Sequence, residues 1–156
     1  MSLKATPIGE IPAETVAVAR AIFPKSNVYM LMRDELGTFY TDEDFAELYP
    51  AVGQPAEAPW RLALVTVMQF AEDLTDRQAA DAVRTRIDWK YALGLSLTDR
   101  GFHFSVLNDF RDRLVKDHAE GLLLDKMLSV FQDHDWLKAA NGSAPMRHMS
   151  WPRCAT

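Results

Sequence analysis

The side chains best suited to contact DNA lie in the middle of the chain, on or beside two expected helices. Arg and Asn can make paired hydrogen bonds to base edges, and Arg, Lys and Ser can bind phosphates. The candidates are Arg77, Arg84, Arg86, Lys90, Ser105, Asn108, Arg111 and Arg113. They are typical of a helix-turn-helix-like portion, in which a capped helix and a later helix face the DNA.

The charge balance favours a second interpretation, the solvated face of an ordinary helical bundle. Residues 60–117 contain nine Lys or Arg and nine Asp or Glu, and the whole chain has a formal net charge of −5. Composition alone therefore predicts no general attraction to nucleic acid. Both interpretations stay open at this point.

No other group of residues predicts a reaction centre. The acidic and histidine residues at 117–118 and 133–135 are neighbours in a helix, where successive side chains point about 100° apart. The four histidines and the single cysteine lack the spacing of zinc ligands. We expect no catalytic residue, no metal site and no cofactor.

The cysteine content and the hydropathy indicate where the protein works. One cysteine excludes an internal disulfide and fits a reducing cytoplasm. No apolar run approaches the roughly 20 residues needed to cross a bilayer. We expect a cytoplasmic protein with no membrane partner.

Helical periodicity predicts an all-α fold, a compact multi-helix bundle. Its expected core helices are 60–71, 76–86, 88–93, 105–114 and 117–134, after shorter helices at 12–24 and 27–36. We divide the chain into a flexible lead-in (1–10), a helical domain (11–138) and a disordered tail (139–156).

Several local signals position these helices. Residues 60–71 are apolar around nearly the whole helix, which predicts a central buried element. Thr75 and Gln78 form a capping box, Thr41 starts a short acidic helix, and Ser105 is expected to cap 105–114. The core is expected to contain the aromatic residues Trp60, Trp89, Tyr91, Phe102, Phe104 and Phe110.

Three blocks of the sequence follow one another in a recognisable order. They are LTDRQAAD at 74–81, IDWKYALGL at 87–95 and FSVLNDFRDRL at 104–114. Together they resemble the N-terminal domain of InsH-type insertion-sequence transposases, over about residues 40–138. The resemblance implies a helical domain for DNA-end recognition or assembly. It also implies a following RNase-H-like domain, in which three acidic residues bind two divalent metals.

The chain departs from that family after its last expected helix. The family continues with a segment like Arg-Gln-Arg-Thr-Asp-(Ser/Ala)-Thr-His-Val-Leu, whose Asp is the first catalytic acid. Residues 142–156 differ, but with GC-rich codons chosen for them, the frame one nucleotide earlier reads RQRTDATHVLAAVRD. We therefore interpret them as out-of-frame translation, which is either accidental or programmed. The alternative is a native disordered tail.

These observations predict a truncated transposase fragment without strand-transfer activity. Its expected partners are transposon-end DNA, full-length transposase or another copy of itself. The alternative is a stand-alone interaction or dimerisation module, which would use apolar faces of the first two helices. That interface would contain Val16, Ile22, Phe23, Val28, Tyr29 and Met32.

Overall fold

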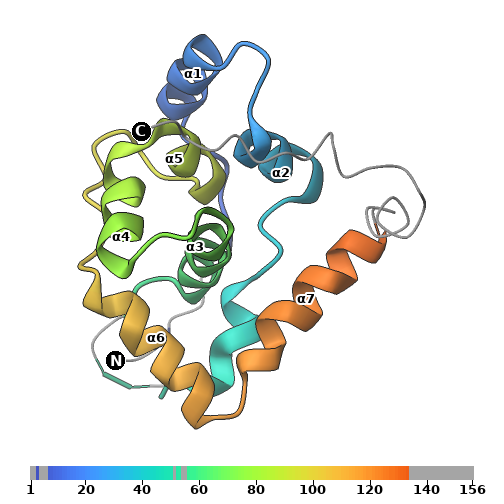
Figure 1. The fold of residues 1–156 in the computed structure, drawn as a ribbon, viewed down its shortest axis with the longest axis vertical. Helices are drawn as coiled ribbons and strands as arrows, with labels where there is room; N and C mark the ends of the chain where they lie inside the picture. Colours follow the sequence, from blue (N-terminus) through green and yellow to red (C-terminus); the bar gives the residue numbers. More distant parts are fainter. Residues whose placement is uncertain (1–2, 4–6, 51, 54–55, 134–156) are drawn as a thin grey trace.

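A computed structural model describes residues 3, 7–50, 52–53 and 56–133, and within them every regular element is a helix (Figure 1). The elements are α1 (Ala13–Ile22), α2 (Val28–Leu36), a short 3-10 helix η1 (Asp42–Leu48), α3 (Pro59–Glu72), α4 (Asp76–Thr85), α5 (Ile87–Leu93), α6 (Ser105–Lys116) and α7 (Glu120–Asp133). The described residues contain no strand, so the all-α prediction is confirmed.

Helix α3 lies at the centre, with the other helices around it (Figure 1). Leu62, Leu64 and Val65 are at most 2% exposed, which confirms the prediction of a central buried helix. Proline is favourable at the first helical position, because an N–H there would have no carbonyl partner within the helix. Phe70 departs from the prediction, since it is 75% exposed near the end of α3.

Helices α1 and α2 both pack against α5. The Thr15 hydroxyl donates a hydrogen bond of 2.7 Å to the Leu95 carbonyl just beyond α5. Tyr29 and Met32 are only 3% and 6% exposed. The expected interface on α1 and α2 is therefore only partly open, because Val16, Phe23 and Val28 are half-buried against the core and only Ile22, at 55%, is exposed.

Two helix starts follow the predicted capping chemistry. In α4 the Thr75 N–H donates to Gln78 Oε1 at 2.9 Å, and the Gln78 N–H donates to Thr75 Oγ1 at 3.2 Å. The Thr41 N–H donates to the Asp44 carboxylate at 2.8 Å at the start of η1. Both caps are confirmed, although the second starts a 3-10 helix.

The boundaries of α6 and α7 differ from the prediction. Phe104, not Ser105, is the N-cap of α6 and makes no side-chain capping bond, so the predicted Ser105 cap is wrong. Helix α6 continues to Lys116, and His118 then takes a positive φ of 54° that separates it from α7. The predicted tail (139–156) and residues 134–138 lie outside the described part of the chain.

Candidate nucleic-acid interface

The eight candidate DNA-contact residues fall into two groups of four. One group is engaged in the fold, and its members are Arg86, Lys90, Arg111 and Arg113. The other group is exposed, and its members are Arg77, Arg84, Ser105 and Asn108. This division decides which side chains can meet a nucleic acid.

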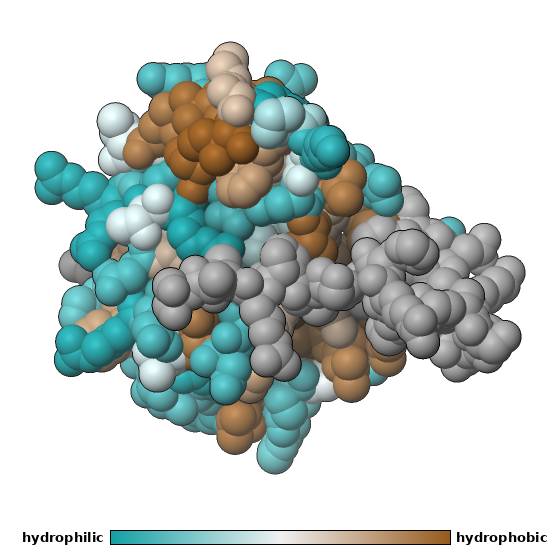
Figure 2. Space-filling model, turned by 45° about the horizontal axis from the view of Figure 1, so that its top comes forward, coloured by the Kyte–Doolittle hydropathy of each residue, from teal (hydrophilic) through white to brown (hydrophobic). Residues whose placement is uncertain are grey.

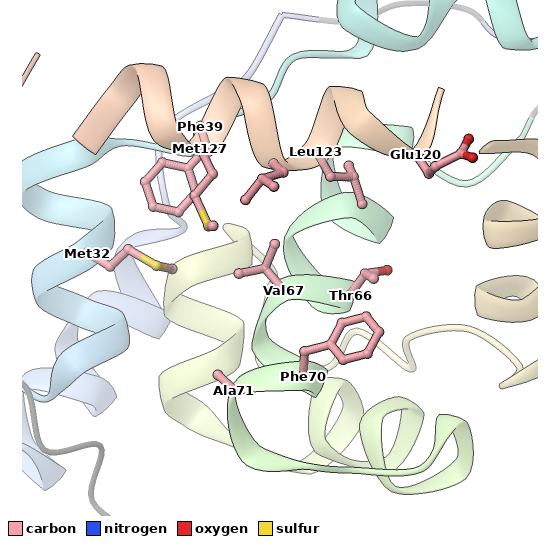
Figure 3. A pocket seen from close by; sticks show the side chains of 10 residues that line it. Met32, Phe39, Thr66, Val67, Phe70, Ala71, Glu120, Leu123 and Met127 are labelled. Carbon is pink, nitrogen blue, oxygen red and sulfur yellow. The ribbon is translucent and has the colours of Figure 1, made fainter. Parts of the chain in front are cut away.

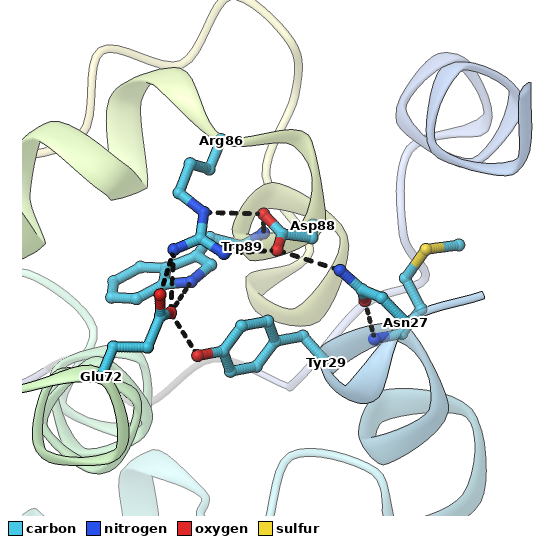
Figure 4. Close-up of polar contacts among 7 residues, drawn as sticks. Asn27, Tyr29, Glu72, Arg86, Asp88 and Trp89 are labelled. Carbon is cyan, nitrogen blue, oxygen red and sulfur yellow. Dashed lines mark hydrogen bonds and ion pairs between the residues drawn. The ribbon is translucent and has the colours of Figure 1, made fainter. Parts of the chain in front are cut away.

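Arg86 is the single residue that joins α4 to α5, and it is the centre of a polar network (Figure 4). Its guanidinium donates to Glu72 at the end of α3 and to Asp88 in α5, each at 2.7 Å. The Trp89 ring N–H and the Tyr29 hydroxyl also donate to the Glu72 carboxylate. The network therefore ties α2, α3 and α5 to the end of α4.

The electrostatics of this network keep Arg86 charged and paired with Glu72 and Asp88. Burial alone would raise the pKa of Glu72, but the hydrogen bonds from Tyr29 and Arg86 hold it below the ordinary value. Burial acts to lower the pKa of Arg86, and the bonds to Asp88 and Glu72 raise it overall. The charged guanidinium thus serves the fold and is not free for DNA.

Lys90 is buried, and the expectation that it is exposed is wrong. Its side chain is 2% exposed, and Nζ donates to the Asp99 carbonyl at 2.7 Å. Burial lowers the pKa of Lys90. The long apolar stem lies in the core while the ammonium holds the loop between α5 and α6.

Two α6 arginines are also engaged. Arg111 donates two hydrogen bonds, of 2.8 and 2.7 Å, to the Asp76 carboxylate in the first turn of α4. Arg113 lies 4.6 Å over the ring of Tyr49 and donates to the Leu48 carbonyl at 3.3 Å. These contacts fix α6 against α4 and η1.

A small cleft of about 180 Å³ lies beside the exposed face of α4. Its lining residues are Arg77, Ala80, Asp81, Arg84, Phe102, His103 and Phe104. It therefore joins two of the exposed candidates to the segment that leads into α6.

The loop wall of this cleft is held close to α4. Gly101 has a φ of +67°, and a Cβ there would lie 3.3 Å from Val83 Cγ1. Its N–H donates to the Asp99 carboxylate at 2.8 Å, and Lys90 binds the Asp99 carbonyl. Glycine is needed because other residues strain at positive φ and a side chain would crowd α4.

Arg77 is the most available cation in the cleft. Its guanidinium carbon lies 4.2 Å from the centre of the Phe104 ring, which orients the side chain. Within the described residues, Arg77 donates no hydrogen bond, so its N–H groups remain free for an acceptor. Arg84 pairs with Asp81, but their side chains are 57% and 65% exposed. Such exposed pairs are weak and exchange readily.

His103 completes the site, although the sequence interpretation did not select it. Its ring centre lies 4.2 Å from that of Phe104. His103 Nδ1 lies 2.9 Å from the Ser105 hydroxyl and accepts from the Ser105 N–H at 3.3 Å. Phe102 and Phe104 were assigned to the core, yet both are only half-buried. The sequence feature that could have identified His103 is its position between two phenylalanines, Phe102 and Phe104.

A second, larger hollow of about 550 Å³ lies between α3 and α7 (Figure 3). Met127 and Leu123 of α7 face Val67 of α3 across it. Phe70 and Leu124 also line it and are 75% and 53% exposed. Figure 2 shows that hydrophobic patches interrupt a largely hydrophilic surface on the face it draws. This hollow lacks the cations that a nucleic acid requires.

Neither a metal-ligand cluster nor a membrane-spanning helix occurs among the described residues. No group of three or more His, Cys, Asp or Glu side chains in that part of the chain is placed to hold a metal ion. None of its helices is both long and apolar enough to cross a bilayer.

Comparison with known proteins gives one match. A family model described as "Transposase domain (DUF772)" matches residues 18–113. The matched range includes all eight candidate DNA-contact residues and both walls of the small cleft. No curated protein and no solved structure matches the chain.

Proposed function

This chain belongs to the transposase domain family DUF772, and on that premise we propose that it binds the DNA ends of a transposable element. The observation that carries the proposal is the exposed cation pair on α4. Among the described residues, Arg77 is held over Phe104 without a hydrogen-bond acceptor, and Arg84 pairs with the exposed Asp81. Arginine in this state suits phosphate oxygens, which accept paired hydrogen bonds.

The remaining exposed candidates extend this surface onto α6. Asn108 has an amide 3.3 Å from the Asp112 carboxylate, both exposed, so a base edge can replace that contact. Ser105 lies at the start of the same helix. We propose that α4 and α6 act as a helix-turn-helix-like pair. Here α5 and the loop at 94–104 replace a short turn, and Arg111 with Asp76 fixes the pair.

We further propose that the helical domain can assemble with a full-length transposase. In the InsH-type transposases that it resembles, the acidic triad of strand transfer belongs to a separate RNase-H-like domain. DNA-end binding and assembly are therefore the roles proposed for the helical part.

The test of DNA binding is a salt titration of fluorescence anisotropy. The probe is a labelled duplex with the terminal inverted repeat found beside the gene, and a scrambled duplex is the comparison. Arg77→Ala and Arg84→Ala should each weaken binding and reduce the slope of log affinity against log salt by about 0.9. Lys25→Ala, which removes an exposed charge between α1 and α2, is the matched control. Absence of binding at low salt would contradict the proposal.

Self-association is the second candidate function. The exposed Phe70 and Leu124 beside the α3–α7 hollow favour it, because exposed apolar groups at a cavity are typical of protein contacts. Light scattering of the wild type and of Phe70→Ser tests this candidate. A monomer at all concentrations would exclude it.

A further inference from the structure

We propose that the cleft between α4 and residues 102–104 binds one unpaired nucleotide of a DNA strand. The Phe104 ring is covered by Arg77 and by His103, so the base would stack on the outer face of His103, and its phosphate would bind Arg77 and Arg84. The inference rests on the proposed DNA binding. It adds that the preferred DNA has a base outside the duplex.

The size of the cleft limits what can occupy it. Its volume of about 180 Å³ is below the roughly 300–1,000 Å³ of pockets for drug-sized ligands. An α-helix, about 10 Å across with its side chains, is too wide for it. A single flat group with a short charged extension suits this space better than a peptide element does.

The chemistry of the walls narrows the choice to a nucleotide. One wall contributes the two arginines of α4, and the other contributes Phe102, His103 and Phe104. Arginine binds phosphate, and aromatic side chains stack on bases. In a duplex the base faces are covered by their neighbours, so only an unpaired or extruded base can use the aromatic wall.

The donors in the cleft are already positioned for an anion. The Phe104 ring orients Arg77 without using its N–H groups. Ser105 engages His103 Nδ1 through its hydroxyl and its N–H, and the His103 ring lies against Phe104. Asp81 is the opposing charge, but its pair with Arg84 is exposed on both sides and exchanges at little cost.

The test compares three labelled DNAs in the same anisotropy assay. All have the same duplex: one is blunt, one has a three-nucleotide overhang, and one has an abasic overhang with the same phosphates. The wild type should bind the normal overhang about 5- to 100-fold more tightly than the abasic one, as expected for base stacking. His103→Ala should bring the ratio of the affinities for the normal and abasic overhangs close to one, and Lys25→Ala should retain the wild-type ratio.

The possible outcomes separate this inference from the proposed function. Equal affinity for normal and abasic overhangs overturns the nucleotide site, while binding of the blunt duplex still supports DNA recognition. A preference that persists in a folded His103→Ala variant overturns the assignment to this cleft. Failure to bind any of the three DNAs overturns both proposals.

Discussion

Arg86→Ala should destabilise the fold strongly, because Arg86 neutralises two buried carboxylates. The Glu72 and Asp88 side chains are 12% and 6% exposed, and both bond to the Arg86 guanidinium at 2.7 Å. Removing one partner of a buried ion pair costs about 3–5 kcal/mol. For a domain of this size that lowers the melting temperature by roughly 6–20 °C.

Urea denaturation followed by tryptophan fluorescence measures this loss, since Trp89 lies in the same network. Arg84→Ala is the matched control, because its ion pair is exposed on both sides and should contribute at most about 1 kcal/mol. Arg86→Lys should fall between the two, since lysine keeps the charge but lacks the forked donors. Equal unfolding midpoints for Arg86→Ala and Arg84→Ala would refute the assignment of Arg86 to the fold.

Three further predictions concern a glycine, two carboxyl groups and the gene. Gly101→Ala should lower the free energy of unfolding by about 1–2 kcal/mol, because its φ of +67° strains alanine; an unchanged urea midpoint would contradict this. The pKa values of the Glu72 and Asp76 carboxyls lie below their ordinary values of 4.5 and 3.8. Their contribution to the free energy of unfolding is therefore complete above those ordinary values, and it is lost as the pH falls through the lowered pKa values. Urea midpoints at pH 7 and pH 3 test this, and equal midpoints would count against it. Sequencing the gene beyond the Lys138 codon should reveal Thr-Asp-(Ala/Ser)-Thr-His in the frame one nucleotide earlier. If that frame does not encode this segment, residues 142–156 are better interpreted as a native tail.

The helices could be predicted because their signals are local. The apolar circumference of 60–71 and the Thr75–Gln78 capping box each depend on residues within a few turns. Helix ends were less certain: the start of α7 depends on the backbone of His118, which no side-chain pattern reveals. Phe70 lines the hollow between α3 and α7, and the sequence around Phe70 does not reveal how these two helices pack.

The site could be predicted only in part, because a cation's availability depends on distant partners. Arg111 bonds to Asp76, 35 positions earlier, and Arg86 bonds to Glu72, 14 positions earlier. Lys90 has the spacing of a surface lysine, yet it bonds to a loop carbonyl. Composition therefore suggests residue types that suit DNA, and tertiary contacts decide which of these side chains are engaged in the fold.

The most direct test of the central claim is the salt-dependent affinity of Arg77→Ala for the terminal inverted repeat. The account predicts that the free energy of unfolding of this variant is within about 1 kcal/mol of the wild-type value, since an exposed cation–π contact contributes about 0.5–1 kcal/mol. It should nevertheless bind the duplex more weakly and with a shallower salt dependence than the wild type and Lys25→Ala. Wild-type affinity and salt slope in a folded Arg77→Ala protein would contradict the account.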